Sequence, residues 1–373
     1  MREFVTGAEV IARASIDSGC NFFAGYPITP ASGILATMMR NLPNNNGVAI
    51  QCEDELASIG YCLGASAAGM KPMTATSGPG ISLYSENIGF AQMAELPIVI
   101  VNVQRMGPAT GGATTGAEGD VNFIRWVTSG GYPMIVLAPT NLEETYRFTC
   151  EAFNLAERFR SPVVLLTCKD LVMNRDTVET NSKFEIRNSK HKLGNRIMAK
   201  PDGFKPYAYA KSDDVPPFAC VGGDILTRIN TSVHDQNGFL AKKPEICGSA
   251  LQHLSDKIMK HAEEIERVSA DIQKGANTII IAYGAAARTA RESVKIARAK
   301  GKKISLLIVY SVWPLPVNAL KKAVGKHKQI IVPEHNLGQY VFEIERLFPD
   351  KKIKSVTKIN GELITPEEIL HGA

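Results

Sequence analysis

The chain has 373 residues, of which 45% are hydrophobic and 21% charged, a composition that is typical of globular proteins and excludes collagen, coiled coils and wholly disordered chains. Lys and Arg number 42 against 37 Asp and Glu, a net charge of +5 that gives no argument for nucleic-acid binding. No apolar run reaches the ~18 residues of a membrane-spanning helix, and the N-terminus has no signal-peptide pattern, so we expect a cytoplasmic protein.

The first 170 residues alternate between predicted strands and helices. A capping-box pattern, Thr6 to Glu9, begins a predicted helix over 7–18. Strands are predicted at 22–26, 48–52, 72–76, 97–103, 133–138 and 162–168. Helices are predicted over 31–42, 54–69, 81–94, 120–128 and 142–159. Because the strands are nearly continuous apolar runs, both faces of the sheet should be buried, which indicates a parallel, doubly wound α/β fold.

The rest of the chain changes character twice. Residues 170–240 are polar and interrupted by prolines, which indicates an irregular connection. A helix over 248–273 is predicted next, and a second capping box starts the last helix at Thr365. Between them, strands are predicted at 278–283, 304–309 and 328–333, and helices over 286–300, 317–325 and 338–347. We therefore predict two α/β domains, residues 1–235 with the connection and residues 245–373.

Two polar segments follow the first strands of the sheet, at the edge where doubly wound folds bind ligands. The first segment consists of Tyr26, Pro27, Ile28, Thr29 and Pro30. Its two prolines restrict the backbone, so the Thr29 hydroxyl has little freedom to lose on binding. The second segment is Glu53-Asp54-Glu55, which either complements a helix dipole or buries the Glu55 carboxylate against a partner chain.

Two further segments stand at the same predicted edge. Ser77-Gly78-Pro79-Gly80 forms either a tight strand–helix turn or a set of backbone amides that faces an anion or a polar ring. Arg105 ends a core strand and is suited to a two-pronged bond with a carboxylate, unless it pairs with Asp120. A loop rich in glycine and hydroxyl residues follows, and it carries Thr110 and Thr114.

The seven cysteines are widely spaced, and no two of them are separated by two residues. This pattern excludes a disulfide framework and a self-contained zinc or iron–sulfur site, so we expect no metal site on this chain. The pattern GxxxxGK[ST] is missing and no GxGxxG follows the first strand, which disfavours a nucleoside triphosphatase or a nicotinamide dehydrogenase.

Taken in order, these motifs resemble the α subunits of the 2-oxoacid:ferredoxin oxidoreductases, most closely those of the four-subunit 2-oxoglutarate type. The likeness rests on YPITP at 26–30, EDE at 53–55, TSGPG at 76–80, RMGPATGGATTG at 105–116 and GD at 119–120. It continues through VHDQNGF at 233–239, AYG at 282–284 and EHNLGQY at 334–340, so it covers nearly the whole chain.

The resemblance implies a thiamine diphosphate enzyme in which this chain supplies the pyrimidine-binding domain and a transketolase C-terminal-like domain. By position, Glu55 matches the glutamate that bonds the aminopyrimidine N1′, which makes it the candidate catalytic residue. Thr29 and Arg105 match residues that contact the 2-oxo acid end of the substrate, and Thr114 matches a further hydroxyl on the substrate side. The candidate cofactor contacts are Tyr26, Pro27, Ile28, Glu55, Ser77, Gly78 and Pro79. The candidate substrate contacts are Thr29, Arg105, Thr110 and Thr114.

The resemblance also implies partners. A β subunit would carry the pyrophosphate and Mg²⁺ site and an iron–sulfur [4Fe-4S] cluster, with γ and ferredoxin-like δ subunits in the same complex. The reaction implied is the oxidative decarboxylation of 2-oxoglutarate with coenzyme A and ferredoxin, or its reverse.

Three alternatives stay open. In the first, the reaction is the same but the substrate is 2-oxoisovalerate or pyruvate. In the second, the chain is a non-catalytic scaffold subunit. The third alternative is a transketolase or dehydrogenase fragment without a link to ferredoxin. Such a fragment would place histidines around the cofactor, yet all seven histidines lie beyond residue 190.

Overall fold

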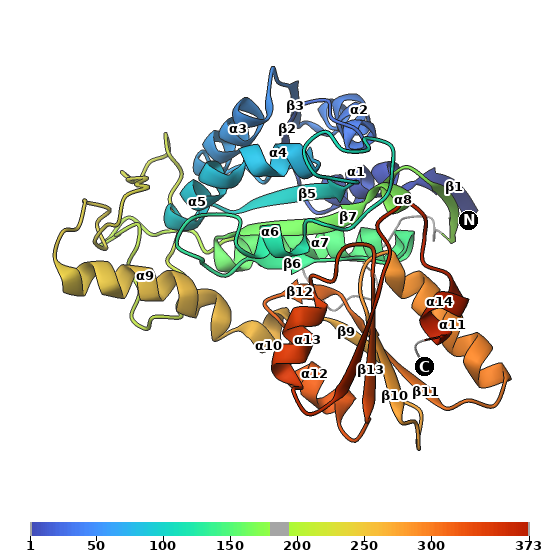
Figure 1. Cartoon of the computed structure of the whole chain (residues 1–373). Coiled ribbons are helices and arrows are strands. Elements are labelled where there is room, and N and C mark those ends of the chain that lie inside the picture. The colour runs from blue at the N-terminus through green and yellow to red at the C-terminus, as the bar shows by residue number, and fades with distance from the viewer. Residues whose placement is uncertain (1, 180–193, 372–373) are drawn as a thin grey trace.

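The computed structural model describes residues 2–179 and 194–371, and it contains two α/β units that pack against each other (Figure 1). The first unit is built on a seven-stranded sheet with the strand order β12-β6-β7-β5-β4-β2-β3. Its strands are β2 (Phe22–Gly25), β3 (Val48–Gln51), β4 (Pro72–Thr76), β5 (Ile98–Gln104), β6 (Ile135–Leu137), β7 (Pro162–Cys168) and β12 (Ser311–Trp313). Neighbouring strands run parallel, except that β12 is antiparallel to β6. The predicted parallel sheet is confirmed.

The central strand β5 shows why both faces of this sheet are covered. Val99, Val101 and Val103 belong to one buried cluster, and Ile98 and Ile100 belong to another, because successive side chains of a strand point to opposite faces. On the first face lie α1 (Gly7–Asp17), α2 (Ser32–Asn41) and α7 (Leu142–Phe159). On the second face lie α3 (Glu55–Ala67), α4 (Gly78–Leu83) and α5 (Ser85–Met93). The fold is doubly wound, as predicted.

Helix caps follow the sequence signals. The Thr6 hydroxyl accepts from the Glu9 amide, and the Glu9 carboxylate accepts from the Thr6 amide, so the predicted capping box is confirmed. Two short helices, α6 (Val121–Arg125) and α8 (Lys169–Val172), complete the unit. In the described ranges, every helix is too short or too polar to cross a bilayer.

The second unit is a five-stranded sheet with the order β14-β13-β10-β11-β9. Its strands are β9 (Val268–Asp271), β10 (Thr278–Ala282), β11 (Ile304–Val309), β13 (Gln329–Glu334) and β14 (Lys352–Thr357), of which only β9 is antiparallel to its neighbour. One face is covered by α11 (Ala286–Ala299) and α14 (Pro366–Leu370), and the other by α12 (Val317–Val324) and α13 (Val341–Leu347). The capping box at Thr365 begins α14 as predicted.

Several elements differ from the sequence prediction. The predicted helix 248–273 is wrong in its second half: α9 (Pro244–Met259) and α10 (Ala262–Ile265) are followed by the edge strand β9. The predicted irregular stretch 170–240 contains β8 (Arg175–Glu179), which pairs with the unpredicted strand β1 (Arg2–Thr6). A short 3₁₀ helix η1 (Pro43–Asn45) follows α2. Residues 180–193 of that stretch lie outside the described residues.

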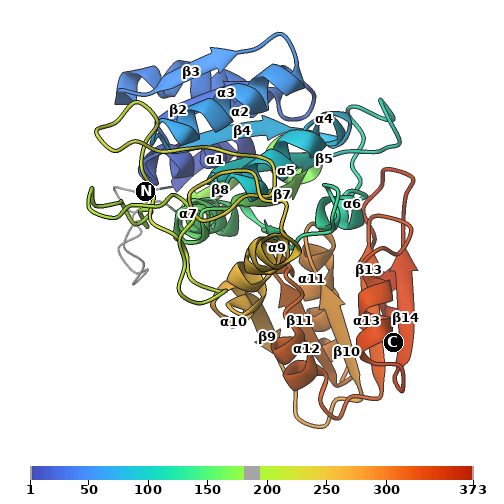
Figure 2. The same cartoon turned by 90° about the vertical axis from the view of Figure 1, so that its left-hand side faces the viewer.

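The two units share structure across their junction. Strand β12 comes from the second half of the sequence but pairs with β6 of the first sheet. Figure 2 shows α9 nearly end-on at the junction, where Lys257 forms an ion pair with Glu95 at 2.7 Å. The division into domains 1–235 and 245–373 stays a prediction, because α9 and β12 belong to the second segment in sequence and lie against the first unit.

Candidate active site

The predicted site segments meet at one edge of the first sheet. Thr29, Ser77 and Arg105 follow β2, β4 and β5, and Glu55 follows β3. These four strands are parallel neighbours in the order β3-β2-β4-β5, so their carboxyl ends lie at the same edge. This is the edge where doubly wound sheets bind ligands.

The three acidic residues 53–55 have three different surroundings. Glu53 is exposed, and Asp54 caps α3 by accepting from the Ala57 amide at 2.7 Å. Glu55 starts the helix and is only 7% exposed. Its carboxylate makes no hydrogen bond or ion pair within the described residues. The two interpretations of this segment therefore apply to different residues. Asp54 complements the helix terminus, whereas Glu55 is a buried carboxylate without a partner among the described residues.

The first turn of α4 packs directly against Glu55. A Cβ on Gly80 would lie 2.0 Å from Thr76 Oγ1 and 2.9 Å from Glu55 Oε1, so only glycine allows this approach. The hydroxyls of Thr76 and Ser77 are buried without a hydrogen-bond partner. The predicted turn at 77–80 is wrong in detail, because Gly78 already begins the helix. Buried polar atoms without partners suit a site that another molecule completes.

Arg105 is buried immediately after β5 and is 7% exposed. One guanidinium nitrogen donates to the carbonyl of Thr29, and Nε has no partner. Within the part of the chain that the structure describes, Arg105 forms no ion pair, so the predicted alternative of a bond to Asp120 is wrong. Thr29 is half-buried and contributes its carbonyl to this contact.

Asp120 is a site residue that the sequence analysis considered only as a partner for Arg105. Its carboxylate accepts from Asn102 Nδ2 at 2.8 Å, and its amide donates to Gln104 Oε1 at 3.0 Å. Burial raises the pKa of the Asp120 carboxyl, and the Asn102 hydrogen bond and the nearby Arg105 charge oppose that rise. A Cβ on Gly78 would lie 3.7 Å from Asp120, which places this carboxylate beside the start of α4.

The remaining predicted residues lie on two loops. Tyr26 and Ile28 are half-buried and Pro27 is exposed, all on the loop that leads from β2 to Thr29. Thr110 and Thr114 are exposed on the loop after Arg105, and neither side chain has a hydrogen-bond partner among the described residues. A short bridge between Met106 and Gly112 closes this loop. The structure therefore does not pair the two threonines with the buried group around Arg105.

Residues 13–215 match the family model of the pyruvate flavodoxin/ferredoxin oxidoreductase thiamine diP-binding region, and residues 276–369 match the pyruvate:ferredoxin oxidoreductase core domain II. A 2-oxoglutarate synthase subunit KorA from Methanocaldococcus jannaschii is 39% identical over 98% of both chains. The chain belongs to the 2-oxoacid:ferredoxin oxidoreductase family. A ketoisovalerate oxidoreductase subunit VorB from Methanothermobacter thermautotrophicus is 31% identical to the present chain, over 99% of the present chain and 96% of VorB.

Solved structures agree with this assignment of the oxidoreductase chain. A 2-oxoglutarate:ferredoxin oxidoreductase from Magnetococcus marinus, solved with 2-oxoglutarate, coenzyme A and succinyl-CoA bound, superimposes with a TM-score of 0.93 at 29% identity. The match covers 99% of this chain and 64% of that one, so the present chain spans less than two thirds of its length. A split-gene transketolase at 12% identity and a TM-score of 0.54 shares the fold.

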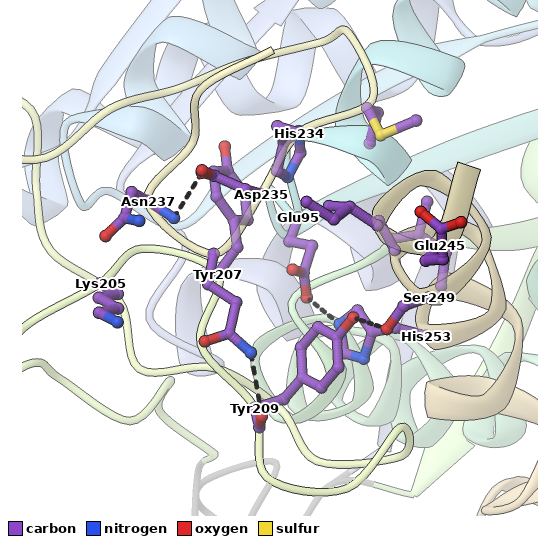
Figure 3. Close-up of a pocket in the computed structure, with 15 residues that line it drawn as sticks. Glu95, Lys205, Tyr207, Tyr209, His234, Asp235, Asn237, Glu245, Ser249 and His253 are labelled. Atoms are coloured by element: carbon purple, nitrogen blue, oxygen red, sulfur yellow. Dashed lines mark hydrogen bonds and ion pairs between the residues drawn. The ribbon is translucent and has the colours of Figure 1, made fainter. Parts of the chain in front are cut away.

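A pocket of about 390 Å³ lies elsewhere on the oxidoreductase chain, between α9 and the connection (Figure 3). It contains none of the predicted site residues. Glu95 lines it and precedes β5, whereas Arg105 follows that strand, and seven residues of strand span about 20 Å. The pocket is therefore at the amino edge of the sheet.

Several polar groups at this pocket bond to one another or to Lys257 beside it. Burial raises the pKa of the Glu95 carboxyl, but the Lys257 ammonium and the His253 ring outweigh it and hold that pKa below its usual range. The ring of His253 stacks on that of Tyr209, with centroids 4.1 Å apart, and the Tyr209 hydroxyl lies 3.0 Å from Ser249. The pocket's charged core is internally satisfied and carries no candidate chemistry.

Glu118 is a second residue that the sequence analysis missed, and it lies between the two units. Its carboxylate accepts from the Ala285 amide at 2.9 Å, while Oε2 has no partner. A Cβ on Gly284, whose φ is +54°, would lie 2.1 Å from the same carboxylate. Burial raises the pKa of Glu118 to about 7, and the charges of Asp170 and Glu334 add to the rise.

We expect Glu118→Gln to change the pH dependence of stability. Between pH 4.5 and 7 the folded wild type holds a proton on Glu118 that the unfolded chain has released, so its stability falls as the pH rises through this window. Glutamine can still accept from Ala285 and does not titrate. The variant should therefore gain up to about 3 kcal/mol relative to wild type from pH 5 to pH 8. Thermal unfolding at four pH values measures this difference.

The exposed residue Glu143 offers a matched control, because Glu143→Gln removes a carboxylate that is not buried. Its difference from wild type should stay constant over the same pH range. If the stability difference between Glu118→Gln and wild type were equally constant, Glu118 would not be a buried carboxyl that binds a proton in the folded state.

Proposed function

We propose that this chain is the α subunit of a thiamine diphosphate-dependent 2-oxoglutarate:ferredoxin oxidoreductase. The reaction is the oxidative decarboxylation of 2-oxoglutarate with coenzyme A to succinyl-CoA, CO₂ and reduced ferredoxin. The observation that carries the proposal is the buried, unpartnered Glu55 carboxylate at the same sheet edge as Arg105. A scaffold subunit would have no reason to bury both charged groups without a counter-ion, because such burial costs free energy.

The residues at this edge fit the pyrimidine half of the cofactor. Glu55 would bond to the pyrimidine ring nitrogen, and the buried hydroxyls of Thr76 and Ser77 offer polar partners beside it. The loop of Tyr26, Pro27 and Ile28 and the α4 start at Gly78 and Pro79 would flank the ring. When bound, thiamine diphosphate supplies the nucleophilic carbon and the electron sink that decarboxylation requires.

The chain's own residues would have separate roles in this reaction. Glu55 holds a proton against the pyrimidine N1′, an acid–base role that favours the reactive tautomer of the cofactor. Arg105 has an unpartnered Nε, which is available to bind the 2-oxo acid carboxylate. Thr29 fixes the guanidinium through its carbonyl, and the loop that follows Arg105 carries Thr110 and Thr114 as further candidate substrate contacts.

The proposed complex contains further subunits. The β subunit would hold the pyrophosphate, Mg²⁺ and an iron–sulfur [4Fe-4S] cluster, and γ and ferredoxin-like δ subunits would complete it. Support comes from the relatives, which are named as subunits, and from the solved oxidoreductase chain, which is longer than this one.

The identity of the 2-oxo acid rests on the graded likeness to relatives. Four 2-oxoglutarate synthase subunits are 36–39% identical to this chain, whereas the ketoisovalerate oxidoreductase subunits are 30–31% identical. This difference favours 2-oxoglutarate over 2-oxoisovalerate, with pyruvate as the remaining candidate.

The complete complex should bind thiamine diphosphate tightly in the presence of Mg²⁺, whereas the isolated chain should bind it weakly, because the chain supplies only the pyrimidine half of the site. Titration calorimetry on both samples measures the difference. With coenzyme A and ferredoxin, the complex should show its highest kcat/KM for 2-oxoglutarate among the three 2-oxo acids.

Tight, Mg²⁺-dependent binding by the isolated chain would contradict the divided site. A higher kcat/KM for 2-oxoisovalerate or pyruvate would reassign the substrate, and a complex without activity on any 2-oxo acid would contradict the enzyme proposal.

A further inference from the structure

The segment Glu334–Tyr340 of the second unit forms a tightly ordered loop. The Glu334 carboxylate accepts from the amides of Tyr340 at 2.8 Å and Val341 at 3.0 Å. Asn336 Oδ1 accepts from the amides of Gly338 and Gln339, at 2.8 and 3.0 Å. Gly338 has a φ of +87°, which favours glycine. The glutamate, asparagine and glycine of this motif therefore fix where Gln339 points.

This loop holds the segment Glu118–Asn122 of the first unit from both sides. The Glu118 amide donates to the His335 carbonyl at 2.8 Å, and Asn336 Nδ2 donates to the Glu118 carbonyl at 2.8 Å. The side-chain amide of Gln339 makes two opposite bonds: its Nε2 donates to the Gly119 carbonyl at 2.6 Å, and its Oε1 accepts from the Asn122 amide at 3.0 Å.

The residue enclosed by these bonds is Asp120. The Gln339 amide bonds to the backbone on both sides of it, at Gly119 and Asn122. Asp120 in turn contacts Asn102 and Gln104 at the end of β5, immediately before Arg105. A displacement of this segment would therefore move the Asp120 carboxylate, which lies close enough to Arg105 for the arginine charge to lower its pKa, and would pull on Gln104, the residue before Arg105.

We propose that Gln339 is a positioning residue for 2-oxo acid binding, acting from the second unit through Asp120 on Arg105. The inference rests on the proposed function, since it concerns the substrate that Arg105 would bind. Gln339 is half-buried, and its own contacts are to backbone atoms of the first unit. It is remote in sequence from the segment it holds, which explains why the motif EHNLGQY at 334–340 had no evident role.

The test compares two variants in the complete complex. Gln339→Met keeps the length of the side chain and loses both bonds, whereas Gln339→Glu keeps the acceptor for Asn122 and loses the donor to Gly119. The loss of one neutral hydrogen bond changes an equilibrium constant by a few-fold. Gln339→Met should therefore raise KM for 2-oxoglutarate by roughly 3- to 10-fold. Gln339→Glu should raise KM at least as much, because a carboxylate oxygen would face the Gly119 carbonyl without a proton to donate, and kcat should stay within about 2-fold for both.

Hydrogen–deuterium exchange of the peptide covering 117–123 supplies a readout that does not need activity. Exchange at this peptide should be faster in Gln339→Met than in wild type. The control is Glu264→Gln, which removes the ion pair between Glu264 and Arg158, another contact between the two units. It should change neither KM nor exchange at 117–123.

The outcomes separate the two proposals. An inactive wild-type complex contradicts the proposed function. An active wild-type complex with an unchanged KM in Gln339→Met contradicts the positioning role, whether or not exchange at 117–123 is faster. A loss of kcat alone with an unchanged KM would also contradict it, because it would point to a general structural defect.

Discussion

Replacing Glu55 by glutamine is expected to slow exchange of the thiamine diphosphate C2 proton in the complete complex by ~10²–10⁴, the usual range for an acid–base residue. Glutamine has the same size but cannot hold the proton that Glu55 shares with N1′. Since the pyrophosphate half of the cofactor would be bound by the partner, thiamine diphosphate affinity should weaken much less. Proton exchange followed by NMR and cofactor titration by calorimetry separate the two effects.

The neighbouring acids give the control for this prediction. Glu53→Gln removes an exposed carboxylate two residues away and should leave proton exchange unchanged. Asp54→Asn keeps a helix-capping side chain at the N-terminus of α3 and should also be nearly neutral. If Glu55→Gln leaves exchange at the wild-type rate, Glu55 is not the acid–base group, and loss of exchange in Glu53→Gln instead would reassign the role.

Arg105→Met should lower kcat/KM for the 2-oxo acid by ~30-fold or more, because removing one partner of a buried charge pair costs on the order of 2–5 kcal/mol. The carboxylate of the substrate would then be desolvated without a counter-ion. Arg105→Lys should restore part of the loss, since an ammonium cannot make the two-pronged bond of a guanidinium. Steady-state kinetics on both variants with 2-oxoglutarate, pyruvate and 2-oxoisovalerate measures the effect.

The pattern over the three substrates locates the contact. An equal loss on all three supports a bond to the shared 2-oxo acid end. A loss confined to 2-oxoglutarate would move Arg105 to the distal carboxylate, and no loss would leave it a structural residue. Arg40→Met, which removes an exposed arginine at the end of α2, should not change the kinetics with any substrate.

The fold was largely predictable because its strands are apolar on both faces and its helices carry capping signals. The exceptions are edge strands, whose existence depends on a distant partner. Val268 continues the helical spacing of Ile258, Ala262 and Ile265, so periodicity extended the helix through it. In the structure Val268 pairs with Val309 on β11, a contact that no local pattern encodes.

The same limit applies to the candidate site. Thr29, Glu55 and Arg105 were predicted to converge because each follows a parallel strand, and the strand order then places them at one edge. Glu118 and Gly119, the neighbour of Asp120, bond to residues of the second unit more than 160 positions later in the chain, Ala285 and Gln339. The GD motif at 119–120 was the available signal, and its meaning required the tertiary structure.

The position of strand β12 affects the chain during synthesis and after truncation. It occupies the outer edge of the seven-stranded sheet, so the backbone amides and carbonyls of β6 are hydrogen-bonded there to a strand synthesised about 170 residues later. A polypeptide cut before residue 311 would present β6 as a bare edge, and bare edges recruit strands from other molecules. During synthesis, the first sheet stays open at this edge until nearly the whole chain has left the ribosome.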